Sequence, residues 1–203
     1  MEARRRGIRI DPSDLLLEIV SIVIAILLAL AVNRWQEGLA HNRTLHESLL
    51  NVRQEIVSNR ATLEKTVPLH QRVATAFLTF VSKRPEGAPL TFAQVFQLFH
   101  RTAPLGFQPV HGDDIAWQIA QSTQAVSYMP YETRAALTRV YDEQTALYSA
   151  QQRFVDTAFS PSAPSNDYYP AAFAAALWLG DVANDESELL RRYETALKLL
   201  PTS

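Results

Sequence analysis

Residues 15–37 read LLLEIVSIVIAILLALAVNRWQE, and this stretch decides the fold because so apolar a run needs a bilayer or a core around it. Its apolar part, 15–32, contains one charged residue, Glu18. A helix rises 1.5 Å per residue, so 15–34 covers ~28 Å, close to the thickness of the hydrocarbon layer. We therefore predict a transmembrane helix over 15–35, anchored at its exit, where indole and guanidinium groups favour the interface, by Asn33, Arg34 and Trp35.

The arginines on either side of the span predict its orientation. The N-terminal tail carries a cluster of them, whereas the other flank has Arg34 and Arg43 at a comparable distance. Positively charged flanks stay in the cytoplasm, so we expect a basic cytoplasmic tail over 1–14 and an extracytoplasmic domain over 36–203. In a double-membrane bacterium this is a single-pass protein of the inner membrane with a periplasmic domain. The arginines of the tail are Arg4, Arg5, Arg6 and Arg9.

A cleaved signal peptide is the alternative interpretation of the same segment. A basic start, an apolar run and the small residues Ala29 and Ala31 all fit a secretory signal. Three features favour a retained anchor instead. The apolar run is longer than the usual hydrophobic region of a signal, Glu18 lies inside it, and helical sequence continues past the expected cleavage site.

One face of the span combines a carboxylate with small residues. At 100° per residue, Glu18, Ser21, Ala25 and Ala29 fall on the same side of the helix. Small residues spaced four apart let two membrane helices approach closely, and a polar side chain there can form a hydrogen bond across the contact. We predict a helix–helix interface on this face, with a second copy or with another membrane protein. The alternative is that Glu18 lies at headgroup level and only sets the depth of the span.

Composition excludes several classes of function. The chain has 203 residues, a net charge of -2 and no cysteine. A nucleic-acid partner is not expected, because phosphate binding needs a clustered basic face. The absence of cysteine rules out disulfides, zinc–thiolate sites and cysteine nucleophiles.

The remaining chain has the periodicity of an all-α domain. An apolar stripe at helical spacing follows the span, with Asn59 in one core position, and predicts a helix to about residue 67 that Pro68 ends. We expect a helical bundle rather than a coiled coil, because the stripe covers fewer than three heptads. The stripe consists of Leu45, Leu49, Val52, Ile56 and Leu63.

Further helices are expected between loops at 84–90, 102–112 and 160–170. They cover 69–82, then 91–100 with a capping box of Thr91 and Gln94, and 114–126 capped by Asp113. A long helix follows over 131–158. A short alanine-rich helix should end at Gly180, and a capping box of Asp185 and Glu188 should open a last helix.

Candidates for chemistry are few. His41 and His46 are five apart and share no helix face, and His111 with Asp113 is explained by a loop and a helix cap. We predict no catalytic residue, no metal site and no cofactor, because no group of side chains meets the first criteria for a site. A ligand pocket lined by tyrosines stays open as an alternative to their usual place at the core edge, and the tyrosines concerned are Tyr128, Tyr131, Tyr141, Tyr148, Tyr168 and Tyr169.

The span also resembles a known family. The run from Glu18 to Glu37 is similar to the N-terminus of an uncharacterised group of bacterial single-pass membrane proteins, whose helix begins with glutamate and exits as A-L-x-x-N-x-W-x-E. The segment 115–144 resembles a second helical block of that group. The group's usual glycines are replaced here by Leu17 and Ala25. The resemblance implies a retained anchor and a helical outer domain, without an assigned reaction. The exit motif is matched by Ala29, Leu30, Asn33, Trp35 and Glu37.

These observations predict a non-enzymatic function. We expect a membrane-anchored interaction or accessory subunit that docks on other membrane proteins, or on itself, through the transmembrane helix and the outer bundle. A periplasmic ligand-sensing domain is the alternative. Its cytoplasmic tail of ~14 residues is too short for an output domain, so a partner would have to carry the signal. A hydrolase built around His111 and Asp113 is the third possibility.

Overall fold

The computed structural model describes residues 12–85, 88–158 and 167–202. Within these ranges it describes the backbone alone at 12–15, 18–19 and 154–158. The described residues form helices and connecting segments without a strand, which confirms the all-α class.

The first helix, α1, runs from Pro12 to Ser82 and is 71 residues long. Contacts divide the chain into two compact units, Met1–Thr44 and Leu45–Ser203, and α1 contributes to both. In the first unit, α1 is the described helix that is long and apolar enough to cross a membrane. The predicted continuation of the span into the next helical segment is therefore confirmed.

The predicted helix end at Pro68 is wrong, because α1 continues through this residue to Ser82. Proline removes one N–H from the helical ladder and disfavours helix at the preceding residue. Burial outweighs that cost here. Val67 is 7% exposed and His70 is 0% exposed, so the turns on both sides of Pro68 are fixed in the core. The expected separate helix over 69–82 is the last part of α1.

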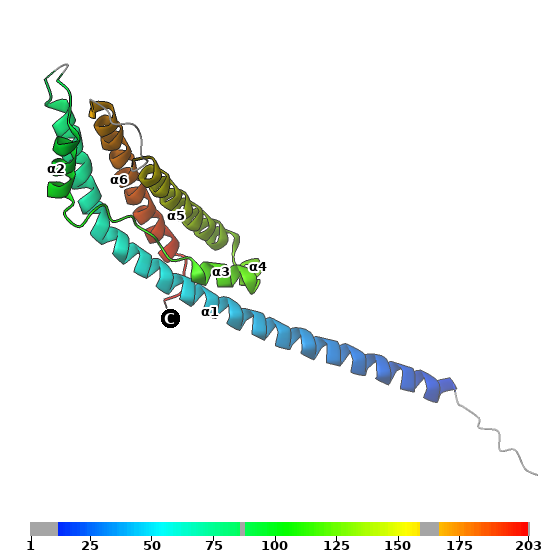
Figure 1. Ribbon diagram of the computed structural model, residues 1–203. Coiled ribbons are helices and arrows are strands. Elements are labelled where there is room, and N and C mark those ends of the chain that lie inside the picture. The colour runs from blue at the N-terminus through cyan, green and yellow to red at the C-terminus, as the bar shows by residue number, and fades with distance from the viewer. Residues whose placement is uncertain (1–11, 86–87, 159–166, 203) are drawn as a thin grey trace, which may run out of the picture. The chain divides into compact units, whose positions relative to one another are not determined.

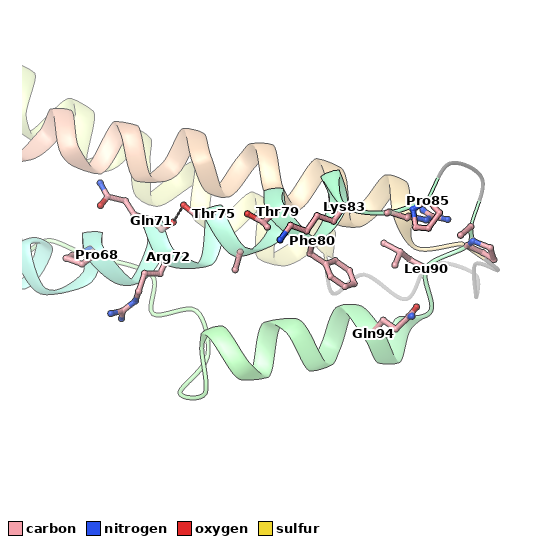
Figure 2. Close-up of a pocket in the computed structure, with 14 residues that line it drawn as sticks. Pro68, Gln71, Arg72, Thr75, Thr79, Phe80, Lys83, Pro85, Leu90 and Gln94 are labelled. Atoms are coloured by element: carbon pink, nitrogen blue, oxygen red, sulfur yellow. Dashed lines mark hydrogen bonds between the residues drawn. The ribbon is translucent and has the colours of Figure 1, made fainter.

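The second unit packs the last part of α1 with five further helices (Figure 1). The long helices α1 and α5 run in one direction, and α2 and α6 return in the other. The short helices α3 and α4 lie against α1 at the end of this unit where Leu45 begins it. Figure 2 shows α2 beside the last turns of α1. The five helices are α2 (Phe92–Thr102), α3 (Ile115–Ser122), α4 (Ala125–Tyr128), α5 (Tyr131–Ala158) and α6 (Tyr169–Leu197).

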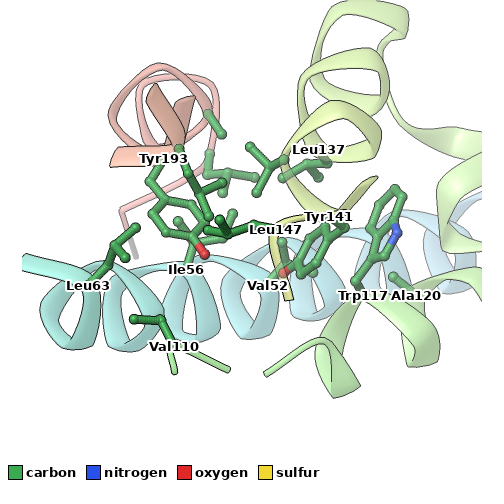
Figure 3. Close-up of a cluster of buried hydrophobic side chains, with 14 of the residues drawn as sticks. Val52, Ile56, Leu63, Val110, Trp117, Ala120, Leu137, Tyr141, Leu147 and Tyr193 are labelled. Atoms are coloured by element: carbon green, nitrogen blue, oxygen red, sulfur yellow. The ribbon is translucent and has the colours of Figure 1, made fainter. Parts of the chain in front are cut away.

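The main core lies between α1, α3, α5 and α6 (Figure 3). Val52, Ile56 and Leu63 of the predicted stripe are 0% exposed, so the periodicity identified the buried face of α1. Tyr193 of α6 enters the same core and is 1% exposed. Full burial of one aliphatic side chain of this core contributes roughly 1.5–3 kcal/mol to stability.

The caps agree with the sequence in one helix and differ in another. Thr91 and Gln94 form the predicted capping box at the start of α2. The helix expected over 114–126 is divided into α3 and α4, because Gln124 adopts a left-handed conformation with φ 59°. Asp114, rather than Asp113, is the N-cap residue of α3, and its side chain makes no capping hydrogen bond.

Gly180 does not end a helix, and the predicted C-cap there is wrong. Gly180 lies inside α6, which also contains Asp185 and Glu188, so the capping box predicted at these two residues is wrong as well. The reason is burial on both sides of the glycine, with Leu179 at 3% and Val182 at 2% exposed. A helix with a buried face tolerates an interior glycine at a cost of ~1 kcal/mol.

Replacing Gly180 with alanine should therefore stabilise the protein by ~0.5–1 kcal/mol, because alanine restricts the unfolded chain and fits a helical backbone. An added Cβ meets no atom within 4 Å at this position. Denaturant unfolding of the full-length protein in detergent, followed by far-ultraviolet circular dichroism, measures the change. The contrasting variant is Gly106→Ala, where φ of +81° should make the same substitution destabilising. Equal effects at both positions would contradict this explanation.

Candidate functional site

The apolar side chains in the N-terminal part of α1 are not covered by other described residues. Every described side chain from Val20 to Leu39 is exposed. The large apolar ones range from 46% exposure at Val20 to 68% at Trp35. An apolar surface of this extent is stable only against lipid or another protein, because water would order around it. The first unit thus carries a large exposed apolar surface over 20–32.

The predicted interface residues lie on this helix. Ser21, Ala25 and Ala29 are helical and exposed, at the four-residue spacing that places them on one face. Glu18 belongs to the same helix, but its side chain lies outside the described residues, as does most of the basic tail at 1–11. The structure therefore leaves the depth and the partner of Glu18 as predictions.

The exit of the span contains a local hydrogen bond between two residues of the motif. Nδ2 of Asn33 donates to Oε1 of Glu37, 2.6 Å away and one helical turn later. Arg34 and Trp35 between them are exposed, as interface anchors need to be. The spacing N-x-x-x-E thus places an amide and a carboxylate on one face of the helix, where they form a hydrogen bond.

In the second unit, several polar residues are buried inside the bundle. His70 of α1 and Glu186 of α6 are both 0% exposed. Nδ1 of His70 lies 2.7 Å from Oε1 and 2.9 Å from Oε2 of the carboxyl group. A contact of this length needs a hydrogen between the two atoms, supplied by the imidazole or by the carboxyl group.

Further contacts complete this buried cluster. Nε2 of Gln151 on α5 donates to Oε1 of Glu186 at 3.1 Å, and Oε1 of Gln151 accepts from the backbone N–H of Val110 at 3.1 Å. The ring of Phe107 stacks on His70 with centroids 4.2 Å apart. The cluster therefore joins α1, α5, α6 and the segment between α2 and α3. Nε2 of His70 has no hydrogen-bond partner among the described residues.

A second buried cluster surrounds Asn59 of α1. Its side chain donates to the carbonyl of Asp113 at 2.7 Å and accepts from the N–H of the same residue at 2.9 Å. Gln144 of α5 donates to the carbonyl of Gly112 at 2.7 Å and accepts from the hydroxyl of Tyr193 at 2.7 Å. The backbone at 112–113 is thus held by two amide side chains. These hydrogen bonds account for the conformation of the backbone within the "HGDD" sequence.

A third contact joins Glu55 to the same end of the bundle. Its carboxylate accepts from the hydroxyl of Tyr141 at 2.7 Å and from the N–H of Ala116 at 2.7 Å. Burial first, and then the neighbouring carboxylate, raise the pKa of Tyr141 well above its ordinary value. Burial also raises the pKa of Tyr193. Both phenols therefore stay neutral and act as hydrogen-bond donors at physiological pH.

Replacing Gly112 with alanine should destabilise the bundle by ~1–3 kcal/mol, because overpacking forces a buried neighbour out of place. A Cβ at this position would lie 2.4 Å from Cδ of Gln144. Gln144 cannot move freely, since its amide also bonds Tyr193 and the backbone. Thermal unfolding of the full-length protein measures the loss. Gln144→Ala removes the clashing group together with its own buried hydrogen bonds, so the double variant should lose less stability than the sum of the two single losses. An unchanged melting temperature for Gly112→Ala alone would contradict the clash.

The histidines and the aspartate considered for chemistry are exposed side chains. His111 and Asp113 are exposed, and His111 contacts Tyr148 through its ring. His41 and His46 are exposed on α1. Within the described residues, the histidines and carboxylates form no group of three or more able to hold a metal ion.

The tyrosines do not gather around a common pocket. Tyr141 and Tyr193 lie in the core, whereas Tyr128 and Tyr131 are 43% and 73% exposed. Neither of the two hollows found on the described surface has a tyrosine in its lining. The aromatic-pocket alternative thus gains no geometric support from these residues.

Sequence reasoning missed the His70–Glu186–Gln151 cluster, although the periodicity contained it. His70 follows Leu63 by seven residues, which continues the stripe of α1 across Pro68. Glu186 occupies a core position between Val182 and Leu189 of α6. A polar residue at a regular core position is the signal for such a cluster.

Comparison of the chain with protein-family models, with curated proteins and with solved structures found no match.

Proposed function

We propose that this protein is a membrane-anchored accessory subunit that docks on another membrane protein, or on a second copy of itself, without catalysing a reaction. The observation that carries the proposal is the exposure of every described side chain from Val20 to Leu39. A helix this apolar, with none of its apolar window buried in its own chain, requires lipid or a partner surface around it.

The small-residue face gives the docking surface. Ser21, Ala25 and Ala29 permit close approach of a second helix, and Glu18 supplies a polar group for a hydrogen bond across the contact. Carboxylates within membrane helices are expensive and are usually functional. A polar contact of this type contributes ~1–2 kcal/mol in model peptides, so its loss weakens association roughly five- to thirty-fold.

The bundle supports a structural function for the outer domain. His70 and Glu186, a buried pair of titratable side chains, are 0% exposed and already bonded to one another. A substrate cannot reach them in this arrangement, so their chemistry serves the fold. We place the bundle on the extracytoplasmic side of the inner membrane, because the arginines concentrate in the N-terminal tail.

Native mass spectrometry of the full-length protein, extracted in a mild detergent, tests the proposal. We expect a stoichiometric complex with a membrane protein, or a homo-oligomer. Glu18→Ala and Ala25→Ile should both reduce that complex, by removing the polar contact and by blocking close approach. The matched control is Ala31→Ile, which adds the same bulk ~120° around the helix from Ala25. A monomer in the wild type, unchanged by Glu18→Ala, would refute the docking function.

A further inference from the structure

A groove lies between the last turns of α1 and the segment that leads into α2 (Figure 2). Its volume is 1020 Å³, at the upper end of the range of small-molecule sites. One stripe of α1 from Pro68 to Phe80, followed by Lys83 just after the helix, forms one side, and Leu90 and Gln94 form part of the other. The groove follows α1 over 15 helical steps, or ~22 Å, so it is long and open rather than compact.

The charged side chains that line the groove among the described residues are all cationic. Arg72, Lys83 and Arg84 line it, and no acidic side chain does so among the described residues. The whole chain has a net charge of -2, so this local excess of cations does not follow from composition. Arg72 and Lys83 are 11 residues apart, so their Cα atoms are ~17 Å apart at the helical rise.

Arg84 is held in place at its end of the groove. Its side chain is 10% exposed, with a terminal nitrogen 3.5 Å from Oδ1 of Asp167. Its guanidinium also lies 4.5 Å from the ring centroid of Tyr169. Backbone N–H groups of Leu90 and Tyr169, more than Arg84, keep the pKa of Asp167 below its usual value, so this carboxylate is charged and fixed.

One N–H group of the Arg84 guanidinium makes no hydrogen bond to a described residue. Its Nε is buried and has no hydrogen-bond partner among the described residues. Buried donors are normally satisfied. Because this Nε is covered by other atoms, a ligand in the open groove would instead meet Arg72 and Lys83, whose side chains are exposed.

We propose that the groove binds an extended acidic peptide segment of the partner protein. Residues four to six positions apart in an extended chain are ~13–20 Å apart, comparable to the Cα spacing of Arg72 and Lys83. Gln71, Thr75 and Thr79 recur every fourth residue along α1 and offer polar groups to the peptide backbone. Phe80 and Leu90, between the two helices in Figure 2, offer apolar contacts for the intervening side chains.

The same features disfavour an acyl chain with a single anionic head. Such a ligand would neutralise one end of the groove and leave the cation at the other end unpaired. It would also cover amide and hydroxyl groups without replacing their hydrogen bonds to water, which is unfavourable. The proposal rests on the docking function given above and specifies the chemistry of the contact made by the outer bundle.

Fluorescence anisotropy with the full-length protein in lipid nanodiscs tests the assignment. The probe is a labelled synthetic peptide with two glutamates five positions apart and alanine, leucine and proline residues between them. We expect saturable binding that weakens as salt rises, and at least tenfold weaker binding of peptides carrying glutamine or lysine at the same positions. Arg72→Gln and Lys83→Gln should each weaken binding of the acidic peptide about fivefold or more, whereas the control Arg139→Gln on exposed α5 surface should not.

Three results would overturn the assignment. They are no saturable binding of the acidic peptide, equal binding of the lysine peptide, and displacement of the acidic peptide by equimolar dodecanoate. Native mass spectrometry of the Arg72→Gln and Lys83→Gln variants separates this proposal from the docking function. Complexes that survive both substitutions but disappear in Glu18→Ala refute the groove and support docking through the span. Peptide binding in a protein that forms no complex refutes docking and supports the groove.

Discussion

Replacing His70 with alanine should lower the free energy of unfolding of the full-length protein by ~3–5 kcal/mol, because breaking a buried pair leaves an unpaired group inside the core. Glu186 is 0% exposed and would lose its shortest hydrogen bond. The remaining contact from Gln151, at 3.1 Å, cannot replace it. Denaturant unfolding in detergent, followed by circular dichroism, measures the change.

Matched variants separate this effect from a simple loss of volume. His46→Ala, at an exposed position of the same helix, should change stability by no more than ~0.5 kcal/mol. Glu186→Gln keeps a hydrogen-bonding partner for His70 and should cost less than His70→Ala. The double variant His70→Leu, Glu186→Leu should recover much of the loss, since apolar residues often replace buried pairs without penalty. A double variant as unstable as the sum of its single substitutions would contradict this account of the cluster.

Placing lysine at both Ile24 and Leu27 should remove the protein from the membrane. Each lysine near the centre of a membrane helix costs roughly 2.5–3.5 kcal/mol on insertion scales, so the pair costs roughly 5–7 kcal/mol. Both positions are exposed, at 52% and 59%, so lysine there disturbs no contact within the chain. Flotation of membranes on a density gradient measures retention and separates membrane-bound protein from aggregates.

The control for this experiment exchanges the same two residues conservatively. Ile24→Leu with Leu27→Ile keeps the apolar surface, and the protein should float with the membranes as the wild type does. If the lysine variant floats to the same extent, the span does not anchor the protein, and the exposed surface of α1 has another purpose.

The bundle was largely predictable where burial repeats along a helix. Val52, Ile56 and Leu63 recur at helical spacing and are buried, and the apolar run after Leu15 has the length of a span. Errors arose where a local rule competed with tertiary packing. Proline and glycine usually interrupt helices, but Pro68 and Gly180 lie between buried turns whose contacts outweigh the local cost.

The buried polar clusters were only half predictable. Asn59 stands out as polar in an apolar stripe, and Gln144, Gln151 and Glu186 occupy similar core positions on their helices. Periodicity predicts that such residues face the core, but it does not predict which of them form hydrogen bonds with one another. That His70 meets Glu186, 116 residues later, depends on how the helices pack. The groove was hidden for the same reason, because its two sides come from different helices.

The central question is whether residues 15–37 stay in the mature protein as a membrane helix or are removed as an export signal. The mass of the intact chain recovered from floated membranes decides this. A retained helix gives the mass of the complete chain, 22.8 kDa, in the membrane fraction. A chain shortened by the residues up to Ala31 and recovered in the soluble extracytoplasmic fraction would contradict the account, because the Glu18–Ala29 face would then be absent from the mature protein.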